Sequence, residues 1–474
     1  MNILLLTPPW SYFELRHPKL KRPSSLYVSA DVSGQGALPP QGLLQLASVL
    51  REAGHEVSLL DGYFKDIALI KECAIVKRPR IIGISTITCL WKKTKALLRE
   101  LRSSLPNSLL VIGGPHANFA KGNCLNESPE LDAVVLGEGG RPLLELTKRV
   151  DYKLDINGIQ GVISRGSSEE DSCACLRSID NMDNIPLPAY DMADFGFYVP
   201  NLSFFDKMPF MHIFTSTGCA KRCGFCAIYD KNPIRMKSVS YLTKEIEYLI
   251  DSFGVRTINF YDDYNIFSHS PEQAYLLCEA LRNLKKGIRW SAYMVNFDIE
   301  RNLLTEMKRS GCFRLNCAVE SGVQENRNRI RGEYFPLEKI RKKIREMRNV
   351  GISTVGRFQF GIPGETFREA LQTIDFACSL PLDYAYFVKI LLSPGSAMFN
   401  SYLEMGRINP DTETWSAYSD FFNPDGMTRR ELALIIKRAY LKFYQRPSWW
   451  MKNIIAPRER CLYGGYLKRI KKAS

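Results

Sequence analysis

The stretch Thr217-Gly218-Cys219-Ala220-Lys221-Arg222-Cys223-Gly224-Phe225-Cys226 decides how the second half of this 474-residue chain folds. It follows the first strand of a predicted β/α alternation and carries three cysteines on one loop. Iron in a four-iron, four-sulfur cluster prefers thiolate ligands, and four cysteines would satisfy all four irons. Three neighbouring thiolates therefore predict a cluster with one iron open to an exchangeable ligand.

Two other interpretations of these cysteines are a zinc site completed by a distant residue such as His212, and three unliganded thiols. Zinc sites usually contain paired Cys-x2-Cys units or a Cys or His partner at short spacing, and no such partner follows Cys226. The chain has 13 cysteines, and its start, Met1 to Trp10, lacks a basic leader and a long apolar run. We therefore expect a soluble, cytoplasmic chain with reduced thiols and metal ligation.

Six β-rich runs alternate with helical runs after Met211. This alternation predicts a closed or partial (β/α)6 barrel of the TIM type, with its chemistry at the carboxyl ends of the strands. The predicted strands are His212 to Ser216, Thr257 to Tyr261, Arg289 to Tyr293, Phe313 to Val319, Ser353 to Phe360 and Tyr384 to Leu391.

The first 150 residues show the same alternation, which predicts a doubly wound parallel sheet covered by helices. The predicted strands are Ile3 to Leu6, Glu56 to Leu60, Ile81 to Ser85, Leu109 to Ile112 and Ala133 to Leu136. Three strand ends lead into turn residues, at Ser85-Thr86, at Gly113-Gly114-Pro115-His116 and at Gly137-Glu138-Gly139-Gly140. Ligands of doubly wound folds bind at these ends, where glycine lets the backbone approach a large molecule, although glycines also serve simple turns.

The chain is expected to divide into four parts, with a polar, proline-containing connector between the two alternations. The predicted parts are a first domain at 1–150, a linker at 151–204, a barrel at 205–425 and a basic helical extension at 426–474. Residues 429–474 carry 13 Lys or Arg against two Glu, which is a balance of +11 out of the net +14. The body is therefore near neutral, and nucleic acid is not an expected partner.

Cys-x3-Cys-x2-Cys with an aromatic residue before the last cysteine resembles the signature of the radical S-adenosylmethionine (SAM) superfamily. The resemblance implies that the open iron binds the amino and carboxylate groups of SAM. It also implies that an electron from the cluster, supplied by a donor such as flavodoxin or ferredoxin, cleaves SAM to a 5′-deoxyadenosyl radical.

Further strand ends resemble the SAM-binding motifs of this superfamily. Ala318-Val319-Glu320-Ser321-Gly322 resembles Gly-Ile-Glu-Ser-Gly but departs at its first two positions. The stretch from Phe360 to Thr366 resembles the fifth-strand motif beside the adenine. Taken alone, the acidic residues could be helix caps or salt-bridge partners. The resemblance implies a SAM site made by Phe225, Tyr261, Asp262, Asp263, Glu320, Ser321, Ile362 and Pro363.

A doubly wound domain before such a barrel resembles the cobalamin-binding subgroup, which includes class B methyltransferases and the anaerobic magnesium-protoporphyrin ester cyclases. Tyr63 stands where methionine-synthase-type domains place a cobalt-ligating histidine, which implies a corrin held without that ligand; His55 and His116 remain in the domain. The implied cobalamin contacts are Tyr63, Ser85, Thr86, Gly113, Gly114, Pro115, His116, Gly137, Glu138 and Gly139. A nucleotide site or a vestigial domain remain alternatives, although Thr7-Pro8-Pro9-Trp10 lacks the glycine-rich turn of a dinucleotide site.

The resemblance implies an enzyme in which the cluster generates the radical and methylcobalamin, recharged by a second SAM, methylates an unactivated carbon of a small-molecule or lipid substrate. Ring formation or another oxidative rearrangement is the alternative within the same machinery, and a non-catalytic sensor is an alternative of another class. Basic residues beside Trp449 and Trp450 suit peripheral membrane contact, but a helical cap with a solvated basic face explains them more simply.

Overall fold

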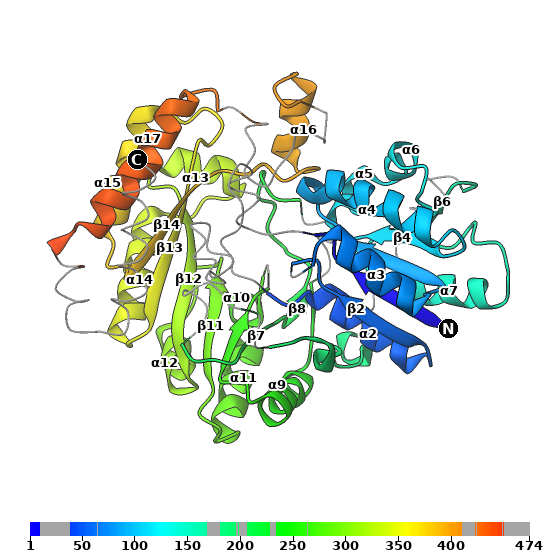
Figure 1. The fold of residues 1–474 in the computed structure, drawn as a ribbon. Coiled ribbons are helices and arrows are strands. Elements are labelled where there is room, and N and C mark those ends of the chain that lie inside the picture. The colour runs from blue at the N-terminus through cyan, green and yellow to red at the C-terminus, as the bar shows by residue number, and fades with distance from the viewer. Residues whose placement is uncertain are drawn as a thin grey trace.

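The computed structural model describes residues 1–9, 38–63, 65–167, 181–195, 198, 206–227, 234–262, 264–409, 422, 424–447 and 449. These residues form two separate sheets, each covered by helices, which face one another across the middle of the molecule (Figure 1). The predicted fold class, a doubly wound sheet followed by a partial barrel, is confirmed.

The first sheet has the strand order β2-β1-β3-β4-β5-β6, with five parallel strands and an antiparallel edge strand β6. Side chains alternate between its faces, so that Ile3 and Leu5 enter one core while Leu4 and Leu6 enter the other. The strands are β1 (Asn2–Leu6), β2 (Glu56–Leu60), β3 (Ile81–Ser85), β4 (Leu109–Gly113), β5 (Ala133–Val135) and β6 (Val162–Ser164).

Helices cover both faces of this sheet. The helices α2 (Gln41–Glu52) and α7 (Gly140–Asp151) pack on one face. The other face is covered by α3 (Ile67–Lys77), α4 (Trp91–Ser104), α5 (Pro115–Ala120) and α6 (Asn123–Glu127). The predicted boundary at residue 150 stays a prediction, and β6 extends the sheet into the predicted linker.

The second sheet is entirely parallel, with the order β14-β13-β12-β11-β10-β7. Its strands are β7 (Phe210–Ile213), β10 (Thr257–Phe260), β11 (Arg289–Met294), β12 (Cys312–Glu320), β13 (Ser353–Phe360) and β14 (Tyr384–Lys389). β7 and β14 are the two ends of the order, so the barrel is partial. Its outer helices are α9 (Val239–Phe253), α10 (Ile266–His269), α11 (Pro271–Asn283), α12 (Arg301–Arg309), α14 (Leu337–Asn349), α15 (Phe367–Ser379) and α17 (Arg429–Tyr444).

The strand predicted at His212 to Ser216 is divided in the structure. β7 ends at Ile213, and a two-residue strand, β8 (Ser216–Thr217), pairs with β9 (Arg235–Met236) in a separate ribbon. The break has a physical cause at Thr215, whose backbone amide and hydroxyl both donate to the carboxylate of Asp262. These hydrogen bonds replace the ladder bonds that a continuous strand would make.

The helix α17 belongs to the outer layer of the barrel. The ring of Phe387 on β14 meets the rings of Tyr440 and Phe443, and the Tyr444 hydroxyl donates to the carbonyl of Ala385. Trp449 is buried and donates its indole N–H to the carbonyl of Asp383. These contacts favour the helical-cap interpretation of this segment; residues 451–474 lie outside the described part of the chain.

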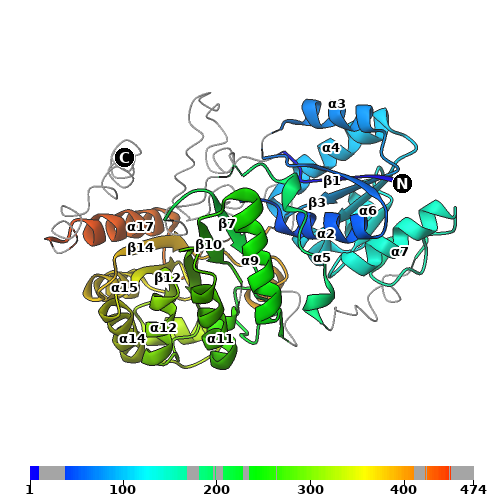
Figure 2. The same cartoon turned by 90° about the horizontal axis from the view of Figure 1, so that it is seen from below.

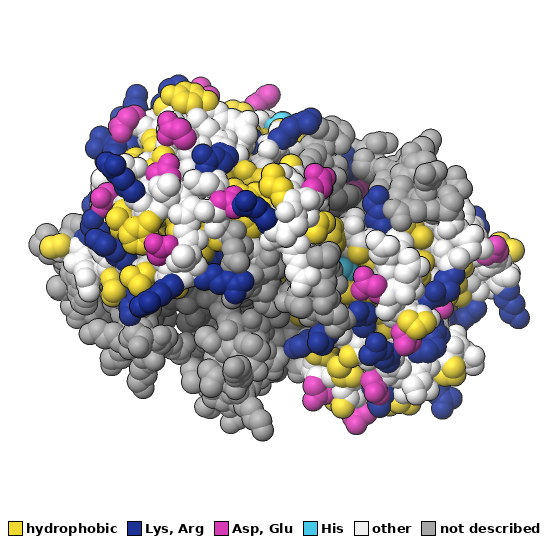
Figure 3. Space-filling model, turned by 90° about the horizontal axis from the view of Figure 1, so that it is seen from above, with side chains coloured by type: hydrophobic (Ala, Val, Ile, Leu, Met, Phe, Trp, Pro, Cys, Tyr) yellow, Lys and Arg dark blue, Asp and Glu magenta, His cyan; other side chains and the backbone are white. Residues whose placement is uncertain are grey.

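The two halves lie side by side (Figure 2), and side chains from both make contacts between them. The amide of Gln41 on α2 donates to the carbonyl of His212, and Phe119 on α5 meets Phe399 on α16 (Ala397–Glu404) edge to face. On the face seen in Figure 3, Lys and Arg side chains are interspersed with Asp and Glu. Within the described residues, no helix is both long and apolar enough to cross a membrane.

Candidate active site

The loop of Cys219, Cys223 and Cys226 leaves β8 at the carboxyl end of the barrel. Gly218 takes a φ of +86°, a conformation that favours glycine, and turns the chain out of the β8–β9 ribbon. The Gly224 amide donates to the carbonyl of Ile330, and the Gly224 carbonyl accepts from the amide of Met398. Backbone contacts from two distant segments therefore hold the loop.

The three thiols differ in exposure, since Cys219 is buried and Cys223 and Cys226 are partly exposed. Burial raises the pKa of the Cys223 thiol, and the positive charge of Arg331 opposes that shift. A cation beside a thiolate loop suits a site that holds several negative sulfurs.

The donor set fits a four-iron cluster better than a single zinc ion. Among the described residues, no group of three or more His, Cys, Asp or Glu side chains surrounds one ion position. Cluster cysteines each bind a different iron and need not converge on one point. His212, one distant residue that could complete a zinc site, is buried with its ring against those of Phe214 and Tyr261.

Arg331 is a site residue that the motif analysis missed. It ends α13 (Gln324–Arg331), and its side chain lies 3.7 Å from Glu320 Oε1 and 3.6 Å from Glu333 Oε1. Burial alone lowers the pKa of this guanidinium, but the nearby Cys223 and Glu320 raise it, and the net direction is upward. The next residue, Gly332, has a φ of +66°, and a Cβ there would lie 2.9 Å from the carbonyl of Arg222. The Arg-Gly pair after the Glu320 motif is the sequence signal that could have identified this contact.

The carboxylate of Asp262 is used within the protein. It is almost fully buried and accepts hydrogen bonds from the Thr215 amide at 2.7 and 2.8 Å. It therefore positions the segment that leads into the cluster loop. Tyr261 lies next to it with its ring against those of His212 and Tyr293, and Asp263 lies outside the described residues. Contact of these side chains with SAM stays a prediction.

Glu320 has the backbone geometry expected of a functional residue. Its φ is +71°, the β12–β13 register shifts between Ala318 and Glu320, and the side chain is buried. A non-glycine residue in this region is strained, and strained residues cluster at binding and catalytic sites. Its carboxylate accepts from Gln359 Nε2 at 2.7 Å. The strand end thus presents a fixed carboxylate close to Arg331.

Ser321 and Gly322 fasten this strand end to α15. The Ser321 hydroxyl lies 3.1 Å from that of Thr373, and the Gly322 amide donates to the same Thr373 oxygen. A Cβ at Gly322 would lie 2.5 Å from the Cβ of Phe376, so only glycine permits this approach. Ser321 therefore contributes to the loop's position; a direct contact with SAM stays a prediction.

The fifth-strand motif is stabilised from within. Glu365 accepts from the amides of Gly361 and Ile362 at 2.7 and 3.3 Å, and burial raises its pKa to about 7. Ile362 is fully buried in an apolar cluster that Phe225 of the cysteine loop partly covers. The Pro363 carbonyl accepts from Arg329. The motif and the cysteine loop therefore share one apolar support.

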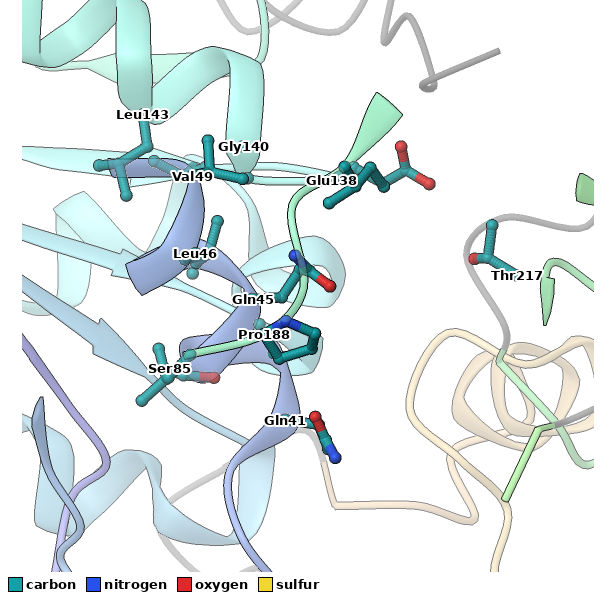
Figure 4. Close-up of a pocket in the computed structure, with 18 of the residues that line it drawn as sticks. Gln41, Gln45, Leu46, Val49, Ser85, Glu138, Gly140, Leu143, Pro188 and Thr217 are labelled. Carbon is teal, nitrogen blue, oxygen red and sulfur yellow. The ribbon is translucent and has the colours of Figure 1, made fainter. Parts of the chain in front are cut away.

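A cavity of about 430 Å³ lies between the two halves. It is lined by the ends of β3, β4 and β5, by one side of α2, and by Ser216, Thr217 and Gly218 directly before Cys219. In Figure 4, Glu138 points toward Thr217, while Val49 and Leu143 lie at the opposite end. The predicted cobalamin residues that line it are Ser85, Gly113, Gly114, Gly137, Glu138 and Gly139.

Glycines keep this cavity open. Gly114 has a φ of +91°, and a Cβ there would lie 2.9 Å from the Ser85 hydroxyl. A Cβ at Gly83 would lie 2.9 Å from Leu5. A largely apolar cavity with a few polar groups, at the carboxyl ends of parallel strands, is where a doubly wound fold binds a large cofactor. The residues present therefore fit cobalamin.

Four predicted cobalamin residues do not line this cavity: Tyr63, Thr86, Pro115 and His116. Tyr63 packs against the core of the second half. The buried His116 ring contacts Trp91 with its centroid at 4.6 Å, and burial lowers its pKa to about 4. Thr86 is buried beside Thr94. His55 bonds to Thr147 and precedes β2, at the other end of the strands from the cavity.

The sequence reasoning missed the polar wall that the second half contributes. Lys237 and Glu245 line the cavity and form a buried ion pair at 2.8 Å. Arg235 on β9 binds Glu138 through two hydrogen bonds, of 2.5 and 3.2 Å, and its side chain is 6% exposed. An Arg-x-Lys pair shortly after a cysteine motif was the available signal.

Comparisons with known proteins identify two domains in the chain. The B12 binding domain model matches residues 31–147, and the radical SAM superfamily model matches residues 213–377. The chain therefore joins a B12-binding domain to a radical SAM domain and is a cobalamin-dependent radical SAM enzyme, with a 4Fe-4S cluster, SAM and cobalamin as its cofactors.

An uncharacterized methyltransferase of Pyrococcus horikoshii is 27% identical over 88% of this chain and 90% of its own length. The cytidylyl-2-hydroxyethylphosphonate methyltransferase of Streptomyces wedmorensis is 25% identical over 78% of this chain and 79% of its own length. The anaerobic magnesium-protoporphyrin IX monomethyl ester cyclase of Rubrivivax gelatinosus is 24% identical over 92% of this chain and 79% of its own length.

Solved structures share the fold of the chain. The radical SAM methyltransferase TsrM from Kitasatospora setae, with cobalamin and a [4Fe-4S] cluster bound, covers 91% of this chain with 84% of its own at a TM-score of 0.67 and 17% identity. The structure of OxsB with aqua-cobalamin and SAM bound matches 99% of this chain and 71% of its own, with a TM-score of 0.70 and 15% identity.

Proposed function

We propose that this chain methylates an unactivated carbon of a small-molecule or lipid substrate. The observation that supports this most directly is the cavity between the halves, because loop 137–140 and Ser216 to Gly218 line the same space. A cobalamin on the first loop would thus face the residues that lead into the cysteine loop.

The chain's own residues would position the reactants. Cys219, Cys223 and Cys226 would hold the cluster, the strand ends around Glu320 and Ile362 would hold SAM, and loops 113–114 and 137–139 would hold cobalamin. When bound, the cluster supplies the electron that cleaves SAM, and cobalamin supplies the methyl group. The buried pairs Arg235–Glu138 and Lys237–Glu245 would close the wall of the cavity and exclude water and oxygen.

Methyl transfer is ranked above ring formation because the relatives at 27% and 25% identity are named methyltransferases. Ring formation is the second candidate, supported by a cyclase relative whose similarity covers 92% of the chain. A sensor role is weaker, because a sensor would not need the strained Glu320 or the strand-end motifs of a SAM pocket.

Anaerobic reconstitution with iron, sulfide, cobalamin and SAM, followed by quantification of 5′-deoxyadenosine and S-adenosylhomocysteine, tests the proposal. Methyl transfer predicts both products in the presence of substrate. 5′-Deoxyadenosine without S-adenosylhomocysteine would favour ring formation. If both products are absent although the cluster is intact and a range of substrates has been tried, the enzymatic role is contradicted.

The remaining proposals concern organisation and partners. The proposed domains of the chain are 1–150, 151–204, 205–425 and 426–474. The proposed electron donor is a reduced flavodoxin or ferredoxin. Limited proteolysis between residues 165 and 205 would test the first boundary. A flotation assay with anionic vesicles would test membrane contact by residues 451–474.

A further inference from the structure

The inner face of the second sheet is polar, whereas the interior of most β/α barrels is filled by branched aliphatic side chains. Alternation along the strands identifies this face. Trp290 points outward, where it stacks on Phe267 of α10 at 4.6 Å, and Cys317 points outward to Met347 of α14. The positions between such residues face inward and include Asn259, Ser291, Tyr293, Asn316, Arg357 and Tyr386.

The deeper layer of this face contains buried polar atoms that lack hydrogen-bond partners within the described residues. These atoms are Nδ1 of His212, Nδ2 of Asn259, and both Oδ1 and Nδ2 of Asn316. Asn259 and Asn316 are 0% exposed. Buried amides in folded proteins are nearly always hydrogen-bonded to protein, to water or to a ligand. This layer is therefore suited to a hydrogen-bonding molecule and unsuited to hydrocarbon.

The layer above it contains a cation surrounded by tyrosines. The Arg357 guanidinium lies 5.3 Å from the ring centre of Tyr293 and 5.5 Å from that of Tyr386, and it donates to the Tyr293 hydroxyl at 3.0 Å. The residue in register on β12 is Ala318, whose methyl group is too short to cover the guanidinium. A planar guanidinium with several donors is the protein group best matched to a carboxylate or phosphate.

This cation lies below the predicted SAM site. Gln359, two residues further along β13 and roughly 7 Å nearer the strand end, donates to the carboxylate of Glu320. Among the described inward positions of β10 to β14, Glu320 is the only carboxylate, and it is already bonded to Gln359 and close to Arg331. An anion at Arg357 would thus meet a net positive surface, with the rest of its molecule extending toward the strand ends.

We propose that this inner face binds the methyl acceptor, and that the acceptor is a hydrophilic molecule with a carboxylate or phosphate group held by Arg357. The inference rests on the proposed methyl transfer and narrows its substrate class. A lipid acceptor is disfavoured, because hydrocarbon packed over Arg357 would remove the guanidinium from water without replacing its hydrogen bonds.

A labelling experiment tests this class even while the acceptor is unidentified. The reconstituted full chain is incubated with methyl-labelled SAM and a metabolite extract from its own cells, and the products are partitioned between water and organic solvent. We expect label in the aqueous phase, retained on an anion exchanger. Label in the organic phase, or in the unretained aqueous fraction, would overturn the inference. If SAM is cleaved but no acceptor is labelled, the proposed methyl transfer fails and the inference with it.

Substitutions then test the assigned residue. Arg357→Gln is expected to raise the KM for the labelled fraction by roughly 100-fold, and Arg357→Lys by less, because an ammonium group keeps the charge but loses the bidentate geometry. Tyr293→Phe, which removes only the bonded hydroxyl, provides a milder variant if Arg357→Gln does not fold. The control is Arg309→Gln on the exposed side of α12, whose side chain is 64% exposed. An unchanged KM in folded Arg357→Gln would remove Arg357 from the binding site.

Discussion

The cysteine loop owes its shape to its neighbours, since Ile330 and Met398 bond its backbone and Gly218 provides its positive φ. Each thiol can therefore be removed without dismantling the loop. We expect Cys219→Ala, Cys223→Ala and Cys226→Ala each to lower the iron content of the reconstituted protein to near zero while leaving the far-ultraviolet circular dichroism spectrum unchanged. Cys73→Ala, a partly exposed thiol on α3, is the matched control. Stoichiometric zinc in place of iron would contradict the cluster assignment.

Glu365 predicts a pH dependence of stability. Its pKa rises from 4.5 to about 7 on folding, because burial penalises the charged carboxylate. The folded state therefore holds its proton over a range where the unfolded state has lost it. This contribution to stability is complete below pH 4.5 and is lost as the pH rises through about 7, amounting to about 3 kcal/mol.

Glu365→Gln keeps an acceptor for the Gly361 amide and removes the titration. We expect the urea midpoint of the wild type, measured anaerobically, to decrease as the pH rises from 5 to 8. The midpoint of the variant should change less over the same range. Glu369→Gln is the control, because Glu369 lies nearby with its pKa lowered by hydrogen bonds to Thr366. A difference between wild type and Glu365→Gln that stays constant with pH would show that Glu365 is already ionised in the folded protein.

At the scale of elements, the β8–β9 ribbon connects the two predicted cofactor sites. Thr217 on β8 pairs with Arg235 on β9, and Arg235 binds Glu138 in the cavity loop of the first half. Removing one partner of a largely buried ion pair takes a desolvated charge away from its counter-charge, at a cost of several kcal/mol. We expect Arg235→Gln to destabilise the protein by about 3 kcal/mol and to weaken hydroxocobalamin binding, measured by spectrophotometric titration.

A double-mutant cycle with Glu138→Gln isolates the interaction between these two side chains. We expect a coupling energy of roughly 2 kcal/mol, because both side chains are largely buried. The comparison is the exposed pair Arg51–Asp191, which joins α2 to the connector and should couple by less than about 1 kcal/mol. Equal coupling in the two cycles would mean that the Arg235–Glu138 pair is only a surface contact.

The sequence predicted elements better than contacts. β3 and β13 lie at the predicted residues, because hydrophobic periodicity is local information. The left-handed backbone of Glu320 could not be predicted, because it depends on the register with the next strand. The ion pair of Arg235 could not be predicted either, because its partner lies 97 positions away. His116 was misleading, since its loop reaches the cavity while its side chain turns into the core beside Trp91.

At the scale of the whole molecule, the cavity has walls from both halves, so one ligand should stabilise both. We expect hydroxocobalamin to slow amide hydrogen exchange at once in α2, in loop 137–140 and across β8–β9, because all three line the cavity or support its wall. The helix α14, on the outer face of the barrel, should exchange at the same rate with and without the ligand. Slower exchange confined to the first half would mean that the ligand binds the doubly wound sheet alone, and that the cysteine loop approaches it only in another conformation of the chain.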